Sequence, residues 1–225
     1  MANTETTINA VIHPQLNETL IDIEKTIKAL ERNKFVVHYF ETGAEAVAYL
    51  KNRIQNKCVA IGDSRTLLEI GVHDALSEVN EDITDIQRPL PGESFRDTAL
   101  RTMGRDVFLT SVNALSQTGE MVNIDGTGNR VAASLFGSQE VFFVLGVNKI
   151  TPDLASAIYR ARNIAAPLNS KKNKKSSLNP CATLDEKCYD CGSPDRICNA
   201  LTIYYKKMRN MQTMEIIIIN ESLGF

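Results

Sequence analysis

Tryptophan is absent from this chain of 225 residues, and histidine occurs only three times. His13, His38 and His73 are scattered without the spacing of metal ligands. Neither an H-E-x-x-H motif nor a G-x-S-x-G motif occurs in the sequence. Zinc-protease chemistry and serine-hydrolase chemistry of these types therefore have no support.

Long apolar segments are also missing. The strongest apolar runs, Val141–Val147 and Ile216–Ile219, are far too short to cross a bilayer. The first residues are polar and show no basic-then-apolar export signal, so we expect a cytoplasmic protein without a membrane span. Neither sign of charge is in large excess, because 25 Lys and Arg residues face 27 Asp and Glu residues. This balance gives no reason to expect nucleic acid or a membrane surface as a partner.

Cysteine is scarce over most of the chain but is clustered between residues 181 and 198. Four of the five cysteines fall within eighteen residues with the spacing C-x6-C-x2-C-x6-C, namely Cys181, Cys188, Cys191 and Cys198. In a reducing compartment, clustered thiols are more often metal ligands or redox groups than structural disulfides. A C-x2-C pair suits a tetrahedral centre, but the full spacing matches neither a zinc ribbon nor a common iron–sulfur pattern. The spacing alone leaves both metals open.

This cysteine segment has few large apolar side chains, so burial alone offsets little of the entropy lost when its backbone is ordered. Four thiolates on one metal would supply the missing stabilisation, and we predict a metal site of four cysteines. Reduced thiols or regulatory disulfides are the alternative. A zinc module that binds nucleic acid is disfavoured, because the segment carries four acidic residues and two basic ones. The remaining cysteine, Cys58, is expected in the core.

Apolar runs that alternate with amphipathic stretches predict the fold class. The runs expected to be strands are Phe35–Phe40, Cys58–Gly62, Ile83–Ile86, Asp106–Asn113, Val141–Val147 and Met214–Asn220. Helical apolar spacing lies between them, first from Leu16 to Leu30 and then from Gly43, from Thr66 and from Ser94. Strands separated by helices indicate an α/β fold with an open, mostly parallel sheet and helices on both faces.

The chain divides into three parts at this level. Residues 1–168 form an α/β ligand-binding core, in which a last helix opens with Thr151 as its N-cap and Pro152 as its first residue. Residues 169–213 form a basic, exposed link and the cysteine-rich extension. Residues 214–225 return to the core as a strand.

Two glycine-containing loops follow predicted strands, where parallel sheets bind ligands. In the first, Gly62 lets the backbone approach a ligand, and Ser64, Arg65 and Thr66 offer hydroxyls and a guanidinium to phosphate or carboxylate. A tight turn with a capping serine is the alternative. The second loop lies within Ser116–Ala133, before a helix expected from Val131, and offers Asn123, Asp125, Gly126, Gly128, Asn129 and Arg130.

The second loop has neither Rossmann nor Walker spacing, and a hairpin turn is its alternative. A third polar turn, which carries Asn148 and Lys149, ends the strongest predicted strand. Because the carboxyl ends of parallel strands meet at one edge of a sheet, we expect the three turns to build one ligand site.

At these residues the sequence resembles the LUD-domain family of lactate utilization proteins. The resemblance covers the chain from about Leu16 to Phe225 and rests on "GDSRTLLEIG", "SVNALSQTGEMVNIDGTGNRVA", "GVNKI", "RNIAAPLN" and the cysteine block. It is closest to the branch that carries a cysteine cluster after the domain. It implies a fold of the NagB/RpiA/CoA-transferase type, whose strand-end loops bind small acidic or phosphorylated metabolites. It also implies a role in lactate oxidation beside iron–sulfur partner subunits, which favours an iron–sulfur cluster over zinc.

One position departs from the sugar-phosphate isomerases of this fold. Their proton-transferring acid matches Asn113 here, and an amide is no base at neutral pH. Asp125 and Glu120 are the nearest carboxylates that could replace it. The alternatives to a redox-linked accessory protein are a phosphosugar isomerase or transferase with structural zinc, and a regulatory module that binds a ligand without turnover. Assembly as a homo-oligomer stays open.

Overall fold

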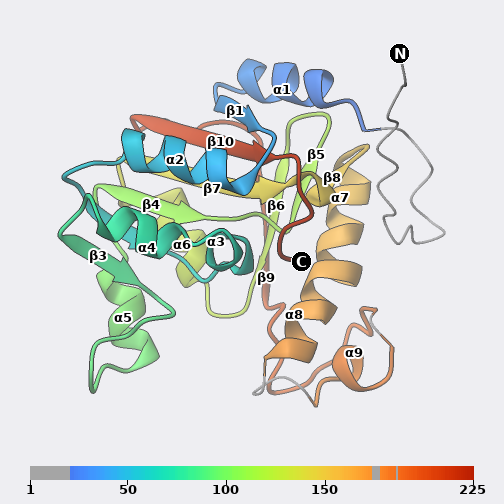
Figure 1. Cartoon of the computed structure of the whole chain (residues 1–225). Coiled ribbons are helices and arrows are strands. Elements are labelled where there is room, and N and C mark those ends of the chain that lie inside the picture. Colours follow the sequence, from blue (N-terminus) through green and yellow to red (C-terminus); the bar gives the residue numbers. More distant parts are fainter. Residues whose placement is uncertain (1–20, 174–177, 186) are drawn as a thin grey trace.

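The computed structural model describes residues 21–173, 178–185 and 187–225. Its main sheet has six strands, and every pair of neighbours is parallel (Figure 1). Their order across the sheet is β1 (Val36–Phe40), β10 (Thr213–Ile219), β7 (Glu140–Gly146), β4 (Val107–Thr110), β2 (Cys58–Ile61) and β3 (Asp82–Asp85). The α/β class and the parallel sheet expected from the sequence are confirmed.

Strands β7 and β10 form the centre of this sheet. All seven residues of β7 are buried, and β10 pairs with β7 from Thr213 opposite Glu140 to Ile219 opposite Gly146. A strand covered on both faces needs apolar side chains on both, which explains the continuous runs in these two segments. The last strand of the chain therefore completes the middle of the sheet.

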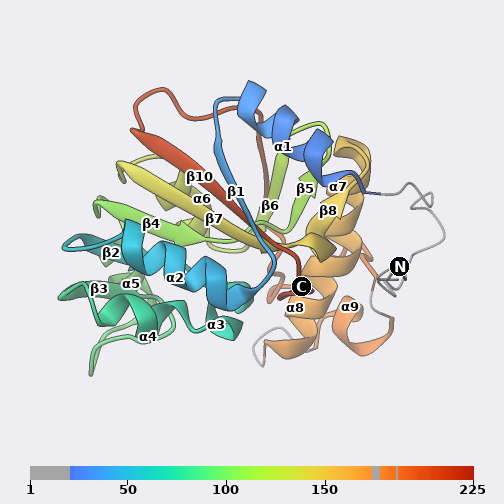
Figure 2. The same cartoon turned by 45° about the horizontal axis from the view of Figure 1, so that its top comes forward.

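Helices cover both faces of the main sheet, as Figure 2 shows. One face packs under α2 (Gly43–Arg53), α3 (Arg65–Glu69) and α4 (Val72–Ser77). The opposite face packs under α1 (Ile23–Arg32) and α6 (Asn129–Leu135). Successive residues of β10 alternate between these two cores. The period of two in a strand thus divides one apolar run between two hydrophobic cores.

A second sheet of four strands was not expected. It consists of β8 (Ile150–Thr151), β5 (Ala114–Ser116), β6 (Met121–Asp125) and β9 (Ala200–Tyr204), in that order. Figure 1 shows β6 and β9 beside the long helix formed by α7 (Leu154–Arg160), a π-helical turn (Ala161–Ala165) and α8 (Ala166–Lys172). Strand β4 ends at Thr110, so the strand predicted to reach Asn113 is too long. The segment read as a polar loop, Ser116–Ala133, instead begins at the last residue of β5 and contains the buried strand β6.

Helix starts follow local capping chemistry, with one correction. The helix after β7 begins at Leu154, and the carboxylate of Asp153 caps it by accepting from the backbone N–H of Ser156. Thr151, the predicted N-cap, instead lies in β8, and its hydroxyl donates to the carbonyl of Leu115 at 3.2 Å. The helix after Gly43 begins where it was predicted, and α6 begins at Asn129, two residues before Val131.

Three further predictions concern the first helix, the basic link and Cys58. The first helix is described from Ile23, and Leu16 lies outside the described residues. The predicted link is helical through Lys172 in α8, while residues 174–177 lie outside the described part. Cys58 is half-buried at the start of β2 and not within the core. The remaining elements are α5 (Phe95–Arg101), a 3-10 turn (Val147–Lys149) and α9 (Pro180–Thr183).

None of the helices in the described part of the chain has the length and apolar character that a bilayer crossing requires.

Candidate functional site

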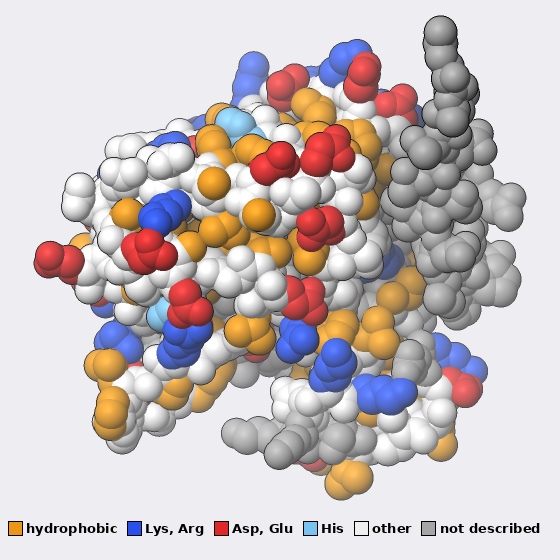
Figure 3. Space-filling model, in the orientation of Figure 1, with side chains coloured by type: hydrophobic (Ala, Val, Ile, Leu, Met, Phe, Trp, Pro, Cys, Tyr) orange, Lys and Arg blue, Asp and Glu red, His pale blue; other side chains and the backbone are white. Residues whose placement is uncertain are grey.

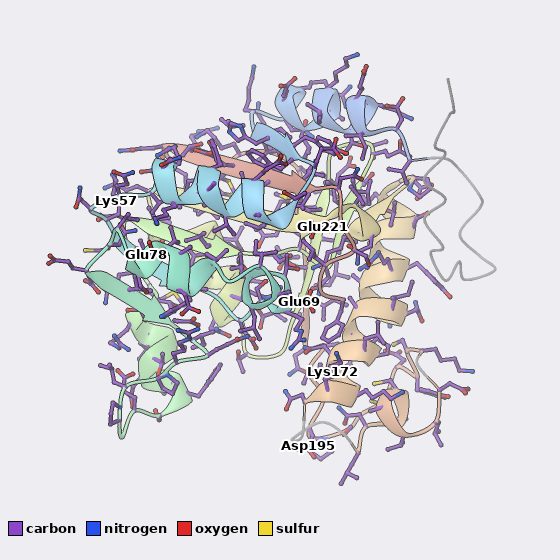
Figure 4. The ribbon with its side chains drawn as sticks, viewed as in Figure 1. Lys57, Glu69, Glu78, Lys172, Asp195 and Glu221 are labelled. Atoms are coloured by element: carbon purple, nitrogen blue, oxygen red, sulfur yellow. The ribbon has the colours of Figure 1, made fainter. Side chains whose placement is uncertain are left out.

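A cavity of about 420 Å³ lies at the carboxyl ends of the central strands. Its walls come from the turns after β2, β4, β6 and β7, from α8 and from Phe225. Figure 3 shows a row of Lys and Arg side chains along the lower part of the molecule. Figure 4 places Glu221 and Glu69 above Lys172, which lines the cavity from α8. The position is the one that parallel α/β sheets use for ligands.

Lys149 is a buried basic residue of this cavity. Its side chain follows β7, is 3% exposed, and donates from Nζ to Thr66 Oγ1 at 2.9 Å and to Ser111 Oγ at 3.0 Å. Within the described residues, no carboxylate forms an ion pair with it. Burial, together with Arg160 and Arg130, lowers the pKa of Lys149 to about 7, against a smaller opposing effect of Glu69.

Two arginines surround the turn that follows β4. Arg160 donates from Nε to the carbonyl of Asn148 at 3.0 Å, and its burial lowers its pKa to about 10. Arg130 donates from Nη2 to the carbonyl of Ile124 at 2.6 Å and to Oδ1 of Asn113 at 3.2 Å. Both guanidiniums thus hold backbone in place and add positive charge near the cavity, and Asp125 Oδ2, 3.7 Å from Arg130 Nε, compensates part of the charge of Arg130.

Asp125 has a structural task that uses both of its carboxylate oxygens. Oδ1 accepts from the backbone N–H groups of Gly128 at 2.8 Å and Thr127 at 3.1 Å, and Oδ2 accepts from Val131 at 3.2 Å. These bonds shape the loop that leads into α6. A carboxylate engaged in this way is poorly placed to remove a proton from a ligand.

The turns beside Lys149 are locked by paired side chains. Two side-chain bonds join Asn113 to β6: Asn123 Oδ1 accepts from the Asn113 N–H at 3.0 Å, and Asn113 Oδ1 accepts from the Ile124 N–H at 2.8 Å. Ser64 caps α3 through the N–H of Leu67 at 3.2 Å. These bonds make the floor of the cavity rigid, which prepares it for a ligand.

The segment from Glu221 to Phe225 crosses the sheet edge next to Lys149. Leu223 donates its N–H to Asn148 Oδ1 at 3.1 Å, and Gly224 donates to Glu69 Oε2 at 2.7 Å. Gly224 has a φ of 62°, and a Cβ there would lie 2.6 Å from Thr66 Oγ1. Only glycine lets the backbone come this close to the buried lysine.

The structure brings together the three turns singled out in the sequence. Seven of the proposed ligand-binding residues line the cavity: Ser64, Arg65, Asp125, Gly126, Asn129, Arg130 and Lys149. Others support it from behind: Thr66 contacts Lys149, Asn123 and Asn148 hold turns, Gly62 packs on Phe108, and Gly128 supplies a left-handed backbone. Glu120 does not line the cavity and lies on the β5–β6 turn, at the other end of β6 from Asp125.

Several lining residues were not identified from the sequence, among them Asp63, Phe95, Ser111, Asn169, Lys172 and Phe225. Lys172 belongs to the basic stretch that was read as a solvated link. Phe225 reaches the cavity only because β10 lies in the middle of the sheet. Its ring packs against Lys172, whose Nζ is 4.9 Å from the ring centroid.

Three of the clustered cysteines gather around two arginines. Arg196 donates to the carbonyls of Cys191 at 2.8 Å and Cys198 at 3.1 Å, and Arg162 donates to Cys188 Sγ at 3.8 Å. Burial raises the pKa of Cys198, and the charges of Cys188 and Cys191 raise it further, against the effect of Arg196. The three thiols therefore lie within electrostatic reach of one another.

The described residues contain no group of three or more His, Cys, Asp or Glu side chains placed to hold a metal ion. Cys181 lies apart in sequence on α9, and its half-buried thiol is free, as are the other four. This arrangement does not fit a closed site of four thiolates, so we derive no chemistry through zinc or an iron–sulfur cluster. The metal site remains a prediction, which elemental analysis of the purified protein can test.

Comparison with known proteins agrees with the geometry of the sheet and its loops. The sequence pattern of the LUD domain matches residues 23–219. This chain belongs to the LUD-domain family. None of the curated proteins matches it.

The LUD-domain chain is also similar to one solved structure, the crystal structure of a DUF162 family protein from Deinococcus radiodurans. The two share 13% sequence identity with a TM-score of 0.51, over 87% of this chain and 94% of that chain. At this identity the likeness establishes the fold alone. The function of the LUD-domain chain therefore has to be argued from its own cavity.

Proposed function

We propose that this LUD-domain protein binds a small acidic or phosphorylated metabolite in its cavity. We further propose that it acts in the cytoplasm as a redox-linked accessory component of lactate or related organic-acid utilization. The observation that carries the binding proposal is Lys149, a buried amine without a carboxylate ion partner among the described residues.

A bound anion would supply the negative charge that Lys149 lacks. Its two hydroxyl partners accept hydrogen bonds from the ammonium but do not neutralise it, and Arg130 and Arg160 add further positive charge. A carboxylate or phosphate in the cavity would complete the charge pair and form a charge-assisted hydrogen bond. A volume of about 420 Å³ suits a metabolite of small size.

The cavity supports binding better than proton transfer. Both carboxylate oxygens of Asp125 accept hydrogen bonds from backbone N–H groups, and the side chain of Asn113 is an amide, which is not a base. Asp63, the other carboxylate in the lining, is exposed and accepts from Gln87 Nε2 at 2.6 Å. These contacts favour a second candidate function, that of a regulatory module which binds its ligand without turnover.

Titration calorimetry with lactate, pyruvate, sulfate and a sugar phosphate tests the binding proposal. We expect at least one anion to bind, and Lys149→Met to weaken that binding about 10- to 100-fold, as for a lost hydrogen bond to a charged group. Lys28→Met is the matched control, because Lys28 is exposed on α1 and pairs with Glu24. Equal affinities of the wild type and Lys149→Met would refute the role of Lys149.

The redox proposal is tested separately. The protein is purified without oxygen, its visible absorption spectrum and metal content are measured, and lactate-dependent reduction of an electron acceptor is assayed with iron–sulfur partner subunits. Iron with visible absorption, or lactate oxidation that needs this chain, supports the proposal. A metal-free protein whose removal leaves lactate oxidation unchanged contradicts it.

A further inference from the structure

The cysteine segment touches the ligand cavity directly. Ile197 lines the cavity and packs its backbone on Gly126, where an added Cβ would lie 3.0 Å from the Ile197 carbonyl oxygen. Asn199 donates its N–H to the carbonyl of Asp125 at 3.0 Å and its side-chain amide to the carbonyl of Gly126 at 2.9 Å. Between these two residues stands Cys198.

Cys198 shares a second hollow with Cys188. Both residues line a space of about 250 Å³, together with Arg162, Arg196 and the start of β9. Cys188 Sγ accepts from the N–H of Asp190 at 3.4 Å and from Arg162, so two N–H donors converge on one sulfur. Both cysteines are half-buried and free, and a small reagent can therefore reach them from the hollow.

We propose that Cys188 and Cys198 form a reversible disulfide that lowers the affinity of the cavity for its anion. The proposal rests on the proposed function for the identity of the ligand. The oxidant is a small-molecule disulfide: the Cys188 thiolate attacks it and releases one thiolate, and the Cys198 thiolate then attacks the mixed disulfide and releases the second. Two protein thiols lose two protons and two electrons, and the reagent becomes two thiols.

The contacts of Asn199 and Ile197 transmit the change. Closing the disulfide draws Cys198 toward Cys188, and its two chain neighbours move with it. Asn199 then loses its bonds to Asp125 and Gly126, the loop that Asp125 organises loosens, and Ile197 withdraws from the cavity wall. Coupling is reciprocal, so a bound anion that orders this loop makes the disulfide harder to form.

Cys191 and Cys58 are less suited to this pair. Cys191 presents its carbonyl to Arg196 and does not line the hollow shared by Cys188 and Cys198. Cys58 lies at the start of β2, where its backbone N–H donates to Asp106 Oδ2 at 3.0 Å. These positions make Cys58→Ser and Cys191→Ser matched controls.

The experiment uses the full chain in the presence of a metal chelator. Reduced protein and protein treated with glutathione disulfide are compared by peptide mapping, by calorimetry with sulfate, and by hydrogen exchange of the backbone amides from Asp125 to Val131. We expect a Cys188–Cys198 crosslink, at least about five-fold weaker binding of sulfate, and faster exchange of the amides bonded to Asp125. Dithiothreitol should reverse all three.

Cys188→Ser and Cys198→Ser should abolish these effects, whereas the two control variants should keep them. A crosslink between other cysteines overturns the proposal, as does a Cys188–Cys198 bond that leaves hydrogen exchange and affinity unchanged. If the reduced protein binds no anion of the panel, the proposed function fails. Hydrogen exchange then decides the coupling by itself: faster exchange on oxidation supports it, and unchanged exchange refutes it.

Discussion

The Nζ atom of Lys149 lies 2.9 Å from Oγ1 of Thr66, a contact between residues 83 positions apart in the chain. It joins the end of β7 to the first turn of α3 inside the cavity. A hydroxyl orients the amine but leaves its charge uncompensated, so burial, together with Arg160 and Arg130, lowers the pKa of Lys149.

Anion binding should weaken as the pH rises above 7, because the free protein then loses the ammonium of Lys149, whose pKa is about 7. The loss should approach tenfold for each further pH unit, in accordance with single-site titration. Calorimetry with sulfate, which keeps its charge over this range, measures the effect. Lys149→Met should bind weakly and without this pH dependence, and a wild-type affinity that is independent of pH would contradict the assignment.

The stability of the fold should also depend on Lys149. Its folded pKa of about 7 lies below the ordinary value of 10.5, so the unfolded chain binds more protons between these two values. The free energy of unfolding should therefore rise with pH across this window, by up to about 1.4 kcal/mol for each pH unit. Below pH 7 the cost of burying the amine is constant. Urea unfolding of Lys149→Met should lack this contribution, and identical slopes would argue against a buried amine.

Gly146 is a position where a single methyl group should disturb the fold. A Cβ there would lie 2.3 Å from the carbonyl oxygen of Glu221, in the segment that crosses beside Lys149. Gly146→Ala should destabilise the protein by about 1–3 kcal/mol, the range for an overpacked site. Gly192→Ala is the control, because a Cβ at Gly192 has no neighbour within 4 Å among the described residues. Thermal unfolding compares the two, and equal melting temperatures would exclude the close approach.

Arg53 balances two buried carboxylates at the opposite end of the sheet from the cavity. It pairs with Glu140 and, at 2.9 Å, with Glu215, which are 5% and 3% exposed. Arg53→Met removes positive charge that compensates both carboxylates, and it should lower the free energy of unfolding by about 2 kcal/mol. This loss is smaller than for a fully buried ion pair, because solvent reaches the guanidinium. Arg88→Met, which breaks an exposed pair with Asp74, should change stability little. Chemical denaturation measures both, and similar losses in the two variants would contradict this account.

Much of the main sheet could be predicted, because its inner strands are buried on both faces and therefore read as continuous apolar runs. The run Val141–Val147 and the run at Ile216–Ile219 correspond to β7 and β10, the two central strands. The second sheet could not be predicted in this way. Strands β5 and β6 carry buried polar residues such as Ser116 and Asn123, and their outer neighbours in the sheet, β8 and β9, come from later parts of the chain.

The candidate site shows the same division. Ser64, Arg65 and Lys149 could be proposed because each follows a strand that was recognised, and parallel strands end at one edge. Asp125 instead ends β6, a strand that was not recognised. The contact between Thr66 and Lys149 depends on atoms that pack together from separate segments. Asp125 organises its loop through N–H groups only two to six residues further along the chain. Residue type suggests what a side chain can do, and its neighbours decide which of those tasks it performs.

By itself the sequence determined the class of fold, the central strands and the edge of the sheet where polar side chains collect, because apolar periodicity and the alternation of strands with helices are local properties of the chain. Only the tertiary structure decided that Lys149 is buried without a carboxylate partner and that the cysteine segment packs against the loop of Asp125. Both facts arise from long-range packing, in which the free energy of a charge or a thiol is set by the neighbours that folding brings to it.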